Sequence, residues 1–316
     1  MNSAVVRPRA MPSSTIQETI RQAGRIILGK ERQIRLALAC LLARGHLLIE
    51  DLPGVGKTTL AHVLAKLLGL NFHRIQFTSD MLPADIIGVA IYERGSSTFK
   101  FHPGPIFAQL ILADEVNRAT PKTQSALLEA MEEHQVTAEG ETRALPEPFF
   151  VVATQNPSYA VGTFPLPESQ LDRFLMRIEL GYPDRDAERQ LLEGADRRDM
   201  IAGLDACLSP GELMELQSTV NTVHVAQPLL DYIQALVEHT RRSPEFATGL
   251  SPRAALALLH ASRAWALIEG RDKVVPEDVQ AVLPGIAGHR LRPVHDGVER
   301  SGVDTAAELI SAVPIP

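Results

Sequence analysis

The chain has 316 residues, of which 45% are hydrophobic and 22% charged, and this composition is that of an ordinary globular protein with a sizeable core. Its formal net charge of −7 gives no general electrostatic reason to bind nucleic acid or an anionic membrane. Two domains are expected from the length. The only two cysteines, Cys40 and Cys207, form no CxxC pair, which argues against a disulfide framework or zinc site and for the cytoplasm.

Residues 1–14 are small, polar and interrupted by prolines, and this pattern predicts a disordered arm. They contain no apolar segment typical of a signal peptide, and no later stretch reaches ~18 uninterrupted apolar residues. We therefore expect neither a signal peptide nor a membrane span.

Residues 15–182 alternate short apolar runs with helical patterns. Five runs, at residues 46–50, 74–77, 110–113, 149–153 and 176–180, are predicted to be strands. Short continuous apolar runs separated by helices are typical of a parallel sheet that is covered on both faces. The fold class is therefore predicted to be α/β, with one helix starting near Lys57 and another capped by Thr120 and Pro121.

Two β-hairpins are predicted as insertions in this core, at about residues 85–107 and 134–149. The first pairs residues 87–92 with 98–102 around Gly95 and Ser96, and the second pairs 135–137 with 142–145 around Gly140. The sequence is equally consistent with plain surface hairpins and with hairpins that contact a substrate.

The strand pattern ends near residue 183, where we place a domain boundary. Helices are predicted at residues 184–198, after a capping box formed by Ser209 and Glu212, and at 228–241, 251–269 and 276–283. Residues 183–291 are thus expected to form a smaller helical domain, and residues 292–316 a weakly ordered tail.

The first segment with chemical character follows the first predicted strand. A phosphate-binding loop needs backbone N–H groups at a helix N-terminus and no bulky side chains at the closest approach, and Gly54 and Gly56 meet this need. The Lys57 ammonium would contact the β- and γ-phosphates, and the Thr58 hydroxyl would bind Mg²⁺. Asp51 stands where the usual G-x-x-x-x-G-K-[ST] pattern has its first glycine. The candidate nucleotide-binding residues of this loop are Pro53, Gly54, Val55, Gly56, Lys57, Thr58 and Thr59.

Polar side chains also end two later strands. Asp114 and Glu115 follow residues 110–113, where Asp114 would hold Mg²⁺ through a water and Glu115 would polarise the attacking water. Asn156, after residues 149–153, could position the same water. Each also has a plainer interpretation, since acidic pairs are common at strand ends and Asn before Pro is an ordinary turn residue.

Two arginines stand out by position. Arg173 closes a short segment after Pro167, and Arg253 lies in the first turn of a helix capped by Ser251. A cation there opposes the helix dipole by ~0.3–1 kcal/mol and calls for a compensating anion or full solvation; a nucleotide phosphate would serve. Either residue is equally consistent with an ordinary surface arginine.

The order of these motifs resembles that of AAA+ ATPases, and residues 49–58, 113–119, 153–157 and 170–174 resemble the MoxR family, in which Asp51 is acceptable. The resemblance implies an AAA+ core followed by a helical lid, with ATP and Mg²⁺ as cofactors. Lys57, Thr58 and Asp114 would then form the ATP and Mg²⁺ site, Glu115 would be the catalytic glutamate and Asn156 the first sensor. Arg253 would be the second sensor and Arg173 the arginine finger for a neighbouring subunit, with Arg118 as a rival. Gly29, within residues 27–29, would lie beside the adenine.

A finger that acts on a neighbour implies a homo-oligomeric ring, with a hexamer expected. The resemblance also implies a chaperone-like ATPase that remodels or activates a protein partner, often one with a von Willebrand factor A domain. Two alternatives remain open, a nucleic-acid motor and a scaffold switched by nucleotide. The acidic balance and the absence of a basic segment interleaved with aromatic residues argue against the motor.

Overall fold

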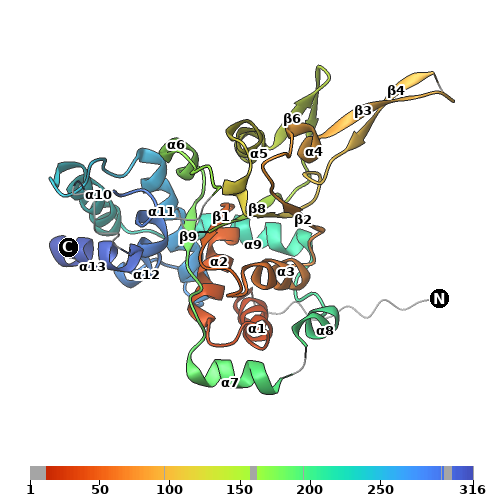
Figure 1. The fold of residues 1–316 in the computed structure, drawn as a ribbon. Coiled ribbons are helices and arrows are strands. Elements are labelled where there is room, and N and C mark those ends of the chain that lie inside the picture. The colour runs from red at the N-terminus through yellow and green to blue at the C-terminus, as the bar shows by residue number, and fades with distance from the viewer. Residues whose placement is uncertain are drawn as a thin grey trace.

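The computed structural model describes residues 12–95, 97–156, 162–194, 196–292, 294 and 301–315. Its centre is a five-stranded sheet in the order β2-β5-β8-β1-β9, in which every pair of neighbours is parallel (Figure 1). The strands of this sheet are β1 (Leu47–Glu50), β2 (Phe72–Gln76), β5 (Leu110–Asp114), β8 (Phe150–Gln155) and β9 (Met176–Ile178). The predicted α/β class and parallel sheet are confirmed.

Both faces of the sheet are covered along its central strands. Successive residues of a strand point to opposite faces, so each of these strands contributes to two hydrophobic clusters. Leu47 and Ile49 of β1 pack into one cluster with helices on one face, whereas Leu48 packs into a second cluster on the other face. The first face is covered by α1 (Pro12–Gly24), α2 (Glu31–Leu42), α3 (Lys57–Leu67) and α9 (Pro210–Thr222), and the second by α4 (Pro83–Ile87) and α5 (Pro121–Glu133). This double cover explains why β1, β5 and β8 are continuous apolar runs, whereas the edge strand β2 buries only Ile75.

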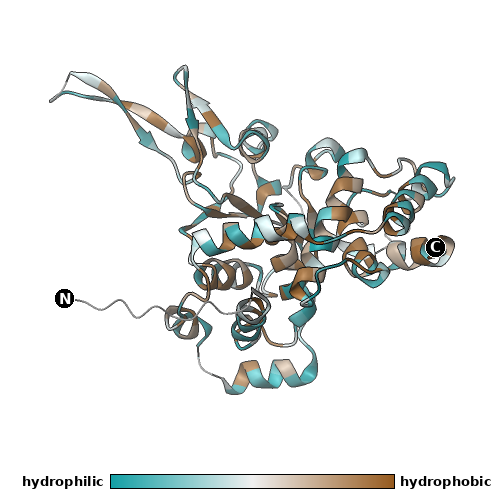
Figure 2. Cartoon of the chain, turned by 180° about the vertical axis from the view of Figure 1, so that it is seen from behind, coloured by the Kyte–Doolittle hydropathy of each residue, from teal (hydrophilic) through white to brown (hydrophobic). Residues whose placement is uncertain are grey.

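Two antiparallel hairpins project from one side of the core (Figure 1). They consist of β3 (Gly88–Glu93) with β4 (Thr98–Pro103), and of β6 (Gln135–Ala138) with β7 (Glu141–Ala144). Both occur where the turn signals predict hairpins, although Ser96 of the first turn lies outside the described residues. The longer hairpin carries hydrophobic segments (Figure 2), and its Tyr92 and Phe99 are 50% and 74% exposed.

The described residues after β9 form helices and no further strand of the sheet. Besides α9, these helices are α7 (Arg185–Glu193), α8 (Arg197–Ala202), α10 (Gln227–Arg242), α11 (Pro252–Ile268), α12 (Pro276–Ala287) and α13 (Gly302–Ala312). Two short helical segments, η1 (Val116–Arg118) and α6 (Glu168–Leu171), precede β9. Helices α8 and α9 lie against α3 and α2 of the core, while α10 to α13 gather beside β9 (Figure 1). None of the helices in the described ranges combines the length and apolar character that crossing a membrane requires.

The structure differs from the sequence-based expectation in three places. Helix α1 begins at Pro12, inside the predicted arm, of which residues 1–11 lie outside the described residues. Residues 184–198 form two helices instead of one, because the chain leaves the helix at Gly194. The tail predicted to be weakly ordered contains α13, whose Ala306 and Leu309 are buried against neighbouring helices. Its apolar stripe spans only three turns, which is too short to stand out in the sequence.

Candidate active site

The loop between β1 and α3 has the backbone form that an anion site needs. Gly54 and Gly56 have φ values of 86° and 100°, in the left-handed region that glycine tolerates. A Cβ built on either glycine would meet no atom within 4 Å, so each faces open space. Since α3 starts at Lys57, its free N–H groups open toward the same space. A phosphate group therefore fits this cradle.

Lys57 is buried at the base of the cradle. Its Nζ donates to the main-chain oxygen of Asp51, to the main-chain oxygen of Gln155 at 3.3 Å and to Oδ1 of Asn156 at 3.1 Å. Burial lowers the pKa of Lys57 below its ordinary value, while the neighbouring carboxylates act in the opposite direction. The cation is thus held within reach of an anion in the loop, and Asn156 is brought to the site as the sequence predicts.

Asp114 ends β5 and is almost fully buried. Its Oδ1 accepts a hydrogen bond of 2.6 Å from the Thr154 hydroxyl, and its Oδ2 forms an ion pair of 2.6 Å with Arg74. The hydroxyl oxygen of Thr58 lies 3.4 Å from the same Oδ2. Hydroxyl and carboxylate oxygens are the ligands that Mg²⁺ prefers, so Thr58 and Asp114 fit the ion with phosphate and water completing its shell.

Glu115 adopts a φ of 57°, a left-handed conformation that is uncommon outside glycine. Its N–H donates to the Thr154 hydroxyl at 2.9 Å, which holds this turn in place. The carboxylate lies 3.4 Å from Nδ2 of Asn156 and forms an ion pair of 2.9 Å with Arg118. Arg118 therefore contacts the acidic pair of its own chain.

Gly29, the residue expected beside an adenine, has a φ of 69°. A Cβ at this position would lie 3.1 Å from Cβ of Ala187, so the segment packs closely against the start of α7. It lines a groove of about 600 Å³ together with Ile27, Lys30 and residues of α1 and α2. The groove has room for a flat base.

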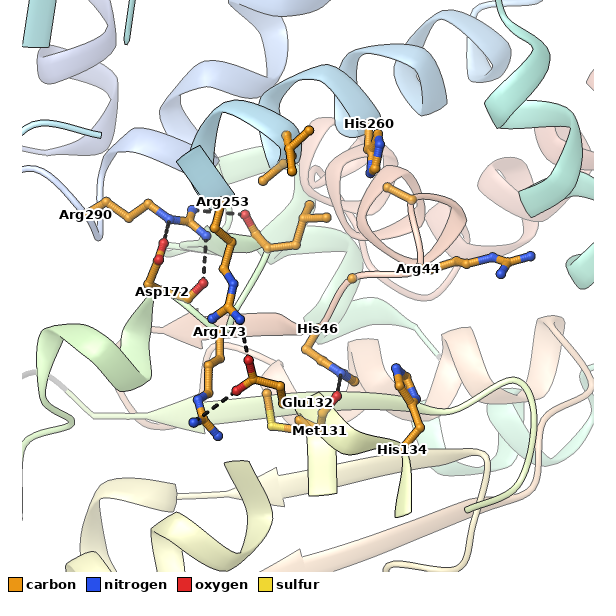
Figure 3. Close-up of a pocket in the computed structure, with 15 residues that line it drawn as sticks. Arg44, His46, Met131, Glu132, His134, Asp172, Arg173, Arg253, His260 and Arg290 are labelled. Atoms are coloured by element: carbon orange, nitrogen blue, oxygen red, sulfur yellow. Dashed lines mark hydrogen bonds and ion pairs between the residues drawn. The ribbon is translucent and has the colours of Figure 1, made fainter. Parts of the chain in front are cut away.

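Arg173 and Arg253 meet in a different place, where they share one carboxylate. Nη2 of Arg173 lies 3.0 Å from Oε2 of Glu132, and Nη2 of Arg253 contacts Oε1 of the same side chain (Figure 3). Arg173 also donates to the main-chain oxygen of Leu128 at 2.7 Å. Within its own chain, Glu132 is thus the anion that compensates Arg253. Both arginines line a cavity of about 300 Å³, which we call the arginine pocket.

The arginine pocket lies at the amino ends of the sheet's strands, and the phosphate loop lies at their carboxyl ends. The pocket is lined by Gly45 and His46, which precede β1, and by Leu175, which precedes β9. The loop follows the other end of β1, and Asp114 and Asn156 lie at the ends of β5 and β8 on that edge. The four residues of β1 span about 13 Å. Neither arginine is therefore hydrogen-bonded to the loop of its own chain.

Three contributing residues were missed by sequence reasoning. Arg74 is a charge within a predicted strand, and this was a usable signal. Thr154 is a polar residue at the end of an otherwise apolar run, two positions before Asn156. Glu132 gave no signal, because Glu129 and Glu133 lie in the same helix and nothing local distinguishes the three.

Comparison with known proteins gives consistent matches along the chain. Residues 46–176 match the family model described as "ATPase family associated with various cellular activities (AAA)", and residues 238–311 match the AAA lid domain. The protein YeaC of Bacillus subtilis is 44% identical, with 95% of this chain and 94% of that protein covered. Chaperone MoxR1 of Mycobacterium tuberculosis is 41% identical, with 90% and 77% covered. A crystal structure from Cytophaga hutchinsonii superposes with a TM-score of 0.88 at 37% identity, covering 96% of each chain.

Proposed function

The chain belongs to the MoxR family of AAA+ ATPases, and we propose that it hydrolyses ATP to ADP and phosphate, with Mg²⁺, at the carboxyl edge of its sheet. One observation carries the proposal. Lys57, Thr58, Asp114, Glu115 and Asn156 come from three separate loops and gather beside the phosphate cradle. Asn156 contacts both Lys57 and Glu115, and Thr58 contacts Asp114. The Thr154 hydroxyl joins the two groups, because it donates to Asp114 and accepts from the N–H of Glu115. A buried cation, a hydroxyl next to a carboxylate and a second carboxylate are the groups that phosphoryl transfer to water requires.

Each side chain then has a role that follows from its contacts. The loop N–H groups and Lys57 bind the phosphates, while Thr58 and Asp114 hold Mg²⁺, the latter through a water. The metal, when bound, neutralises charge that develops on the phosphate oxygens. Glu115 orients and polarises the attacking water. Asn156 fixes the positions of Glu115 and Lys57 relative to each other, because its amide contacts both.

The catalytic unit of this proposal is an interface between two chains in a homo-oligomeric ring, expected to be a hexamer. Arg173 and Arg253 lie at the edge of the sheet opposite the phosphate loop, so in a head-to-tail ring they would face the ATP of the next subunit. A correctly placed arginine of this kind accelerates phosphoryl transfer by ~10³ to 10⁵. Arg118 is less suited to this role because it lies beside Glu115, at the strand ends that carry the phosphate loop of its own chain.

We further propose that the ATPase cycle remodels or activates a cytoplasmic protein partner, with a von Willebrand factor A domain protein as the first candidate. A relative that is 41% identical is named a chaperone. The projecting hairpin formed by β3 and β4 exposes Ile91, Tyr92 and Phe99, and exposed apolar groups of this kind favour contact with protein.

The Glu115→Gln variant tests this function. It should bind ATP and lose turnover, so that a pull-down with the variant and ATP retains the partner. Retained turnover would remove Glu115 from its role. If the ATPase rate of the unmodified protein rises with DNA and not with an A-domain protein, the nucleic-acid motor replaces the chaperone.

A further inference from the structure

Asp51 replaces the first glycine of the usual phosphate-loop pattern, and its carboxylate is bound outside the phosphate cradle. Oδ2 accepts hydrogen bonds from the N–H groups of Leu180 and Gly181, at 2.7 and 2.6 Å. Oδ1 accepts from the N–H of Leu52 at 2.7 Å. Leu180 and Gly181 belong to residues 179–184, which join β9 to α7 and which we call the connector. One side chain of the phosphate loop thus holds the connector through two charge-assisted bonds.

The connector is held at a second point by the segment expected to contact the adenine. Nζ of Lys30 donates to the main-chain oxygen of Tyr182 at 2.7 Å. Next to it, the position of a Cβ on Gly29 would lie 3.3 Å from Oδ2 of Asp184. The phosphate loop and the segment beside Gly29 therefore contact the same short stretch of chain, which precedes every helix from α7 to α13.

Lys57 links this arrangement to the phosphates. An ammonium group has three donors, and those of Lys57 have three acceptors: the main-chain oxygens of Asp51 and Gln155, and Oδ1 of Asn156. Binding of a phosphate must therefore release at least one of them. The Asp51 oxygen belongs to the residue whose carboxylate holds the connector, so a change in the Lys57 contact acts directly on that residue.

We infer that Asp51 is a positioning residue that couples occupancy of the phosphate loop to the connector and, through it, to the helices that carry Arg253. The inference rests on the proposed ATP site. In the structure, Lys57 donates to the main-chain oxygen of Asp51, and the carboxylate of Asp51 accepts the two N–H groups of the connector. When Lys57 turns toward phosphate, Asp51 is freed to shift with the connector, and the position of the C-terminal helices responds to nucleotide.

The Asp51→Gly variant separates this role from phosphate binding, because it restores the glycine of the usual pattern. Hydrogen exchange of the Leu180 and Gly181 amides is measured with and without ATP and Mg²⁺, in a Glu115→Gln background that prevents turnover. In the parent, we expect ATP to change the exchange rate of these amides by ~10-fold or more. When Asp51→Gly is added to this background, the two amides should exchange fast both with and without ATP, and ATP affinity should stay within ~3-fold of the parent. In a protein that retains Glu115 and can turn over, Asp51→Gly should lower kcat by ~10-fold.

Two further variants distinguish this role from a general loss of folding. Asp51→Asn keeps one acceptor oxygen and should give an intermediate kcat and intermediate protection, which a simple loss of folding would not. Asp186→Asn removes a nearby exposed carboxylate from the first turn of α7 and should leave both readouts unchanged.

The inference is overturned if Asp51→Gly keeps the kcat and the ATP-dependent exchange of the parent. It is equally overturned if ATP affinity falls more than ~30-fold while connector exchange is unchanged, since Asp51 would then belong to the phosphate cradle itself. If the unmodified protein neither binds nor hydrolyses ATP, the proposed function fails, whatever Asp51 does.

Discussion

Thr154 fixes the positions of Asp114 and Glu115, although it lies on the neighbouring strand β8. Its side chain is fully buried, its hydroxyl donates to Oδ1 of Asp114 at 2.6 Å, and the same hydroxyl accepts from the N–H of Glu115 at 2.9 Å. Thr154→Val keeps the shape of the side chain and removes both bonds. A hydrogen bond to a charged group contributes ~1.5–3 kcal/mol, and a buried N–H without a partner costs ~1–3 kcal/mol. We therefore expect the free energy of unfolding to fall by about 3 kcal/mol.

The matched control is Thr154→Ser, which keeps the hydroxyl and loses one methyl group, at a cost of ~1 kcal/mol. Urea unfolding with a check that the m-value is unchanged measures both variants. The ATPase rate provides a second readout, because a displaced Asp114 and Glu115 should lower kcat by ~10-fold or more in the valine variant only. If the valine variant is as stable and as active as the serine variant, Thr154 does not position the acidic pair.

Two further predictions concern the arginine pocket. Burial lowers the pKa of His46 to about 4, so below about pH 6.5 the unfolded chain binds a proton that the folded chain does not. Stability is therefore lost as the pH falls: from pH 7.5 to pH 5, His46 alone should cost about 2 kcal/mol of unfolding free energy, and in urea titrations His46→Gln should lack that increment. In Gly45→Ala, the added Cβ would lie 2.3 Å from Cβ of Leu175, and we expect a loss of ~1–3 kcal/mol in urea unfolding. Gly211→Ala, where the added Cβ meets open space, should show no loss, and equal stability of the two alanine variants would contradict the packing.

The fold and the residues around the phosphate loop could be predicted because their signals are local. Buried parallel strands are continuous apolar runs, and the phosphate loop follows one of them directly, so Lys57 and Asp114 could be assigned to one edge of the sheet. Asn156 could be added because parallel strands end at the same edge. These deductions need only the spacing of residues along the chain.

The remaining contacts join residues that are distant in sequence. Glu132 binds Arg253, 121 positions away, and Asp51 binds the N–H of Gly181, 130 positions away. Neither pair has a spacing rule, because the contact depends on how α11 and the connector pack against the core. The same limit explains the tail, where α13 acquires its partners only through packing against other helices.

The most direct test of the intersubunit site mixes two inactive variants. Lys57→Ala lacks the phosphate-loop cation and keeps Arg173, whereas Arg173→Ala lacks the finger and keeps the loop. In rings assembled from equal amounts of both, about a quarter of the interfaces pair an intact loop with an intact finger, so we expect about a quarter of the normal ATPase rate. Absence of any activity at every mixing ratio would contradict the account and return the role to Arg118 or to a site within one chain.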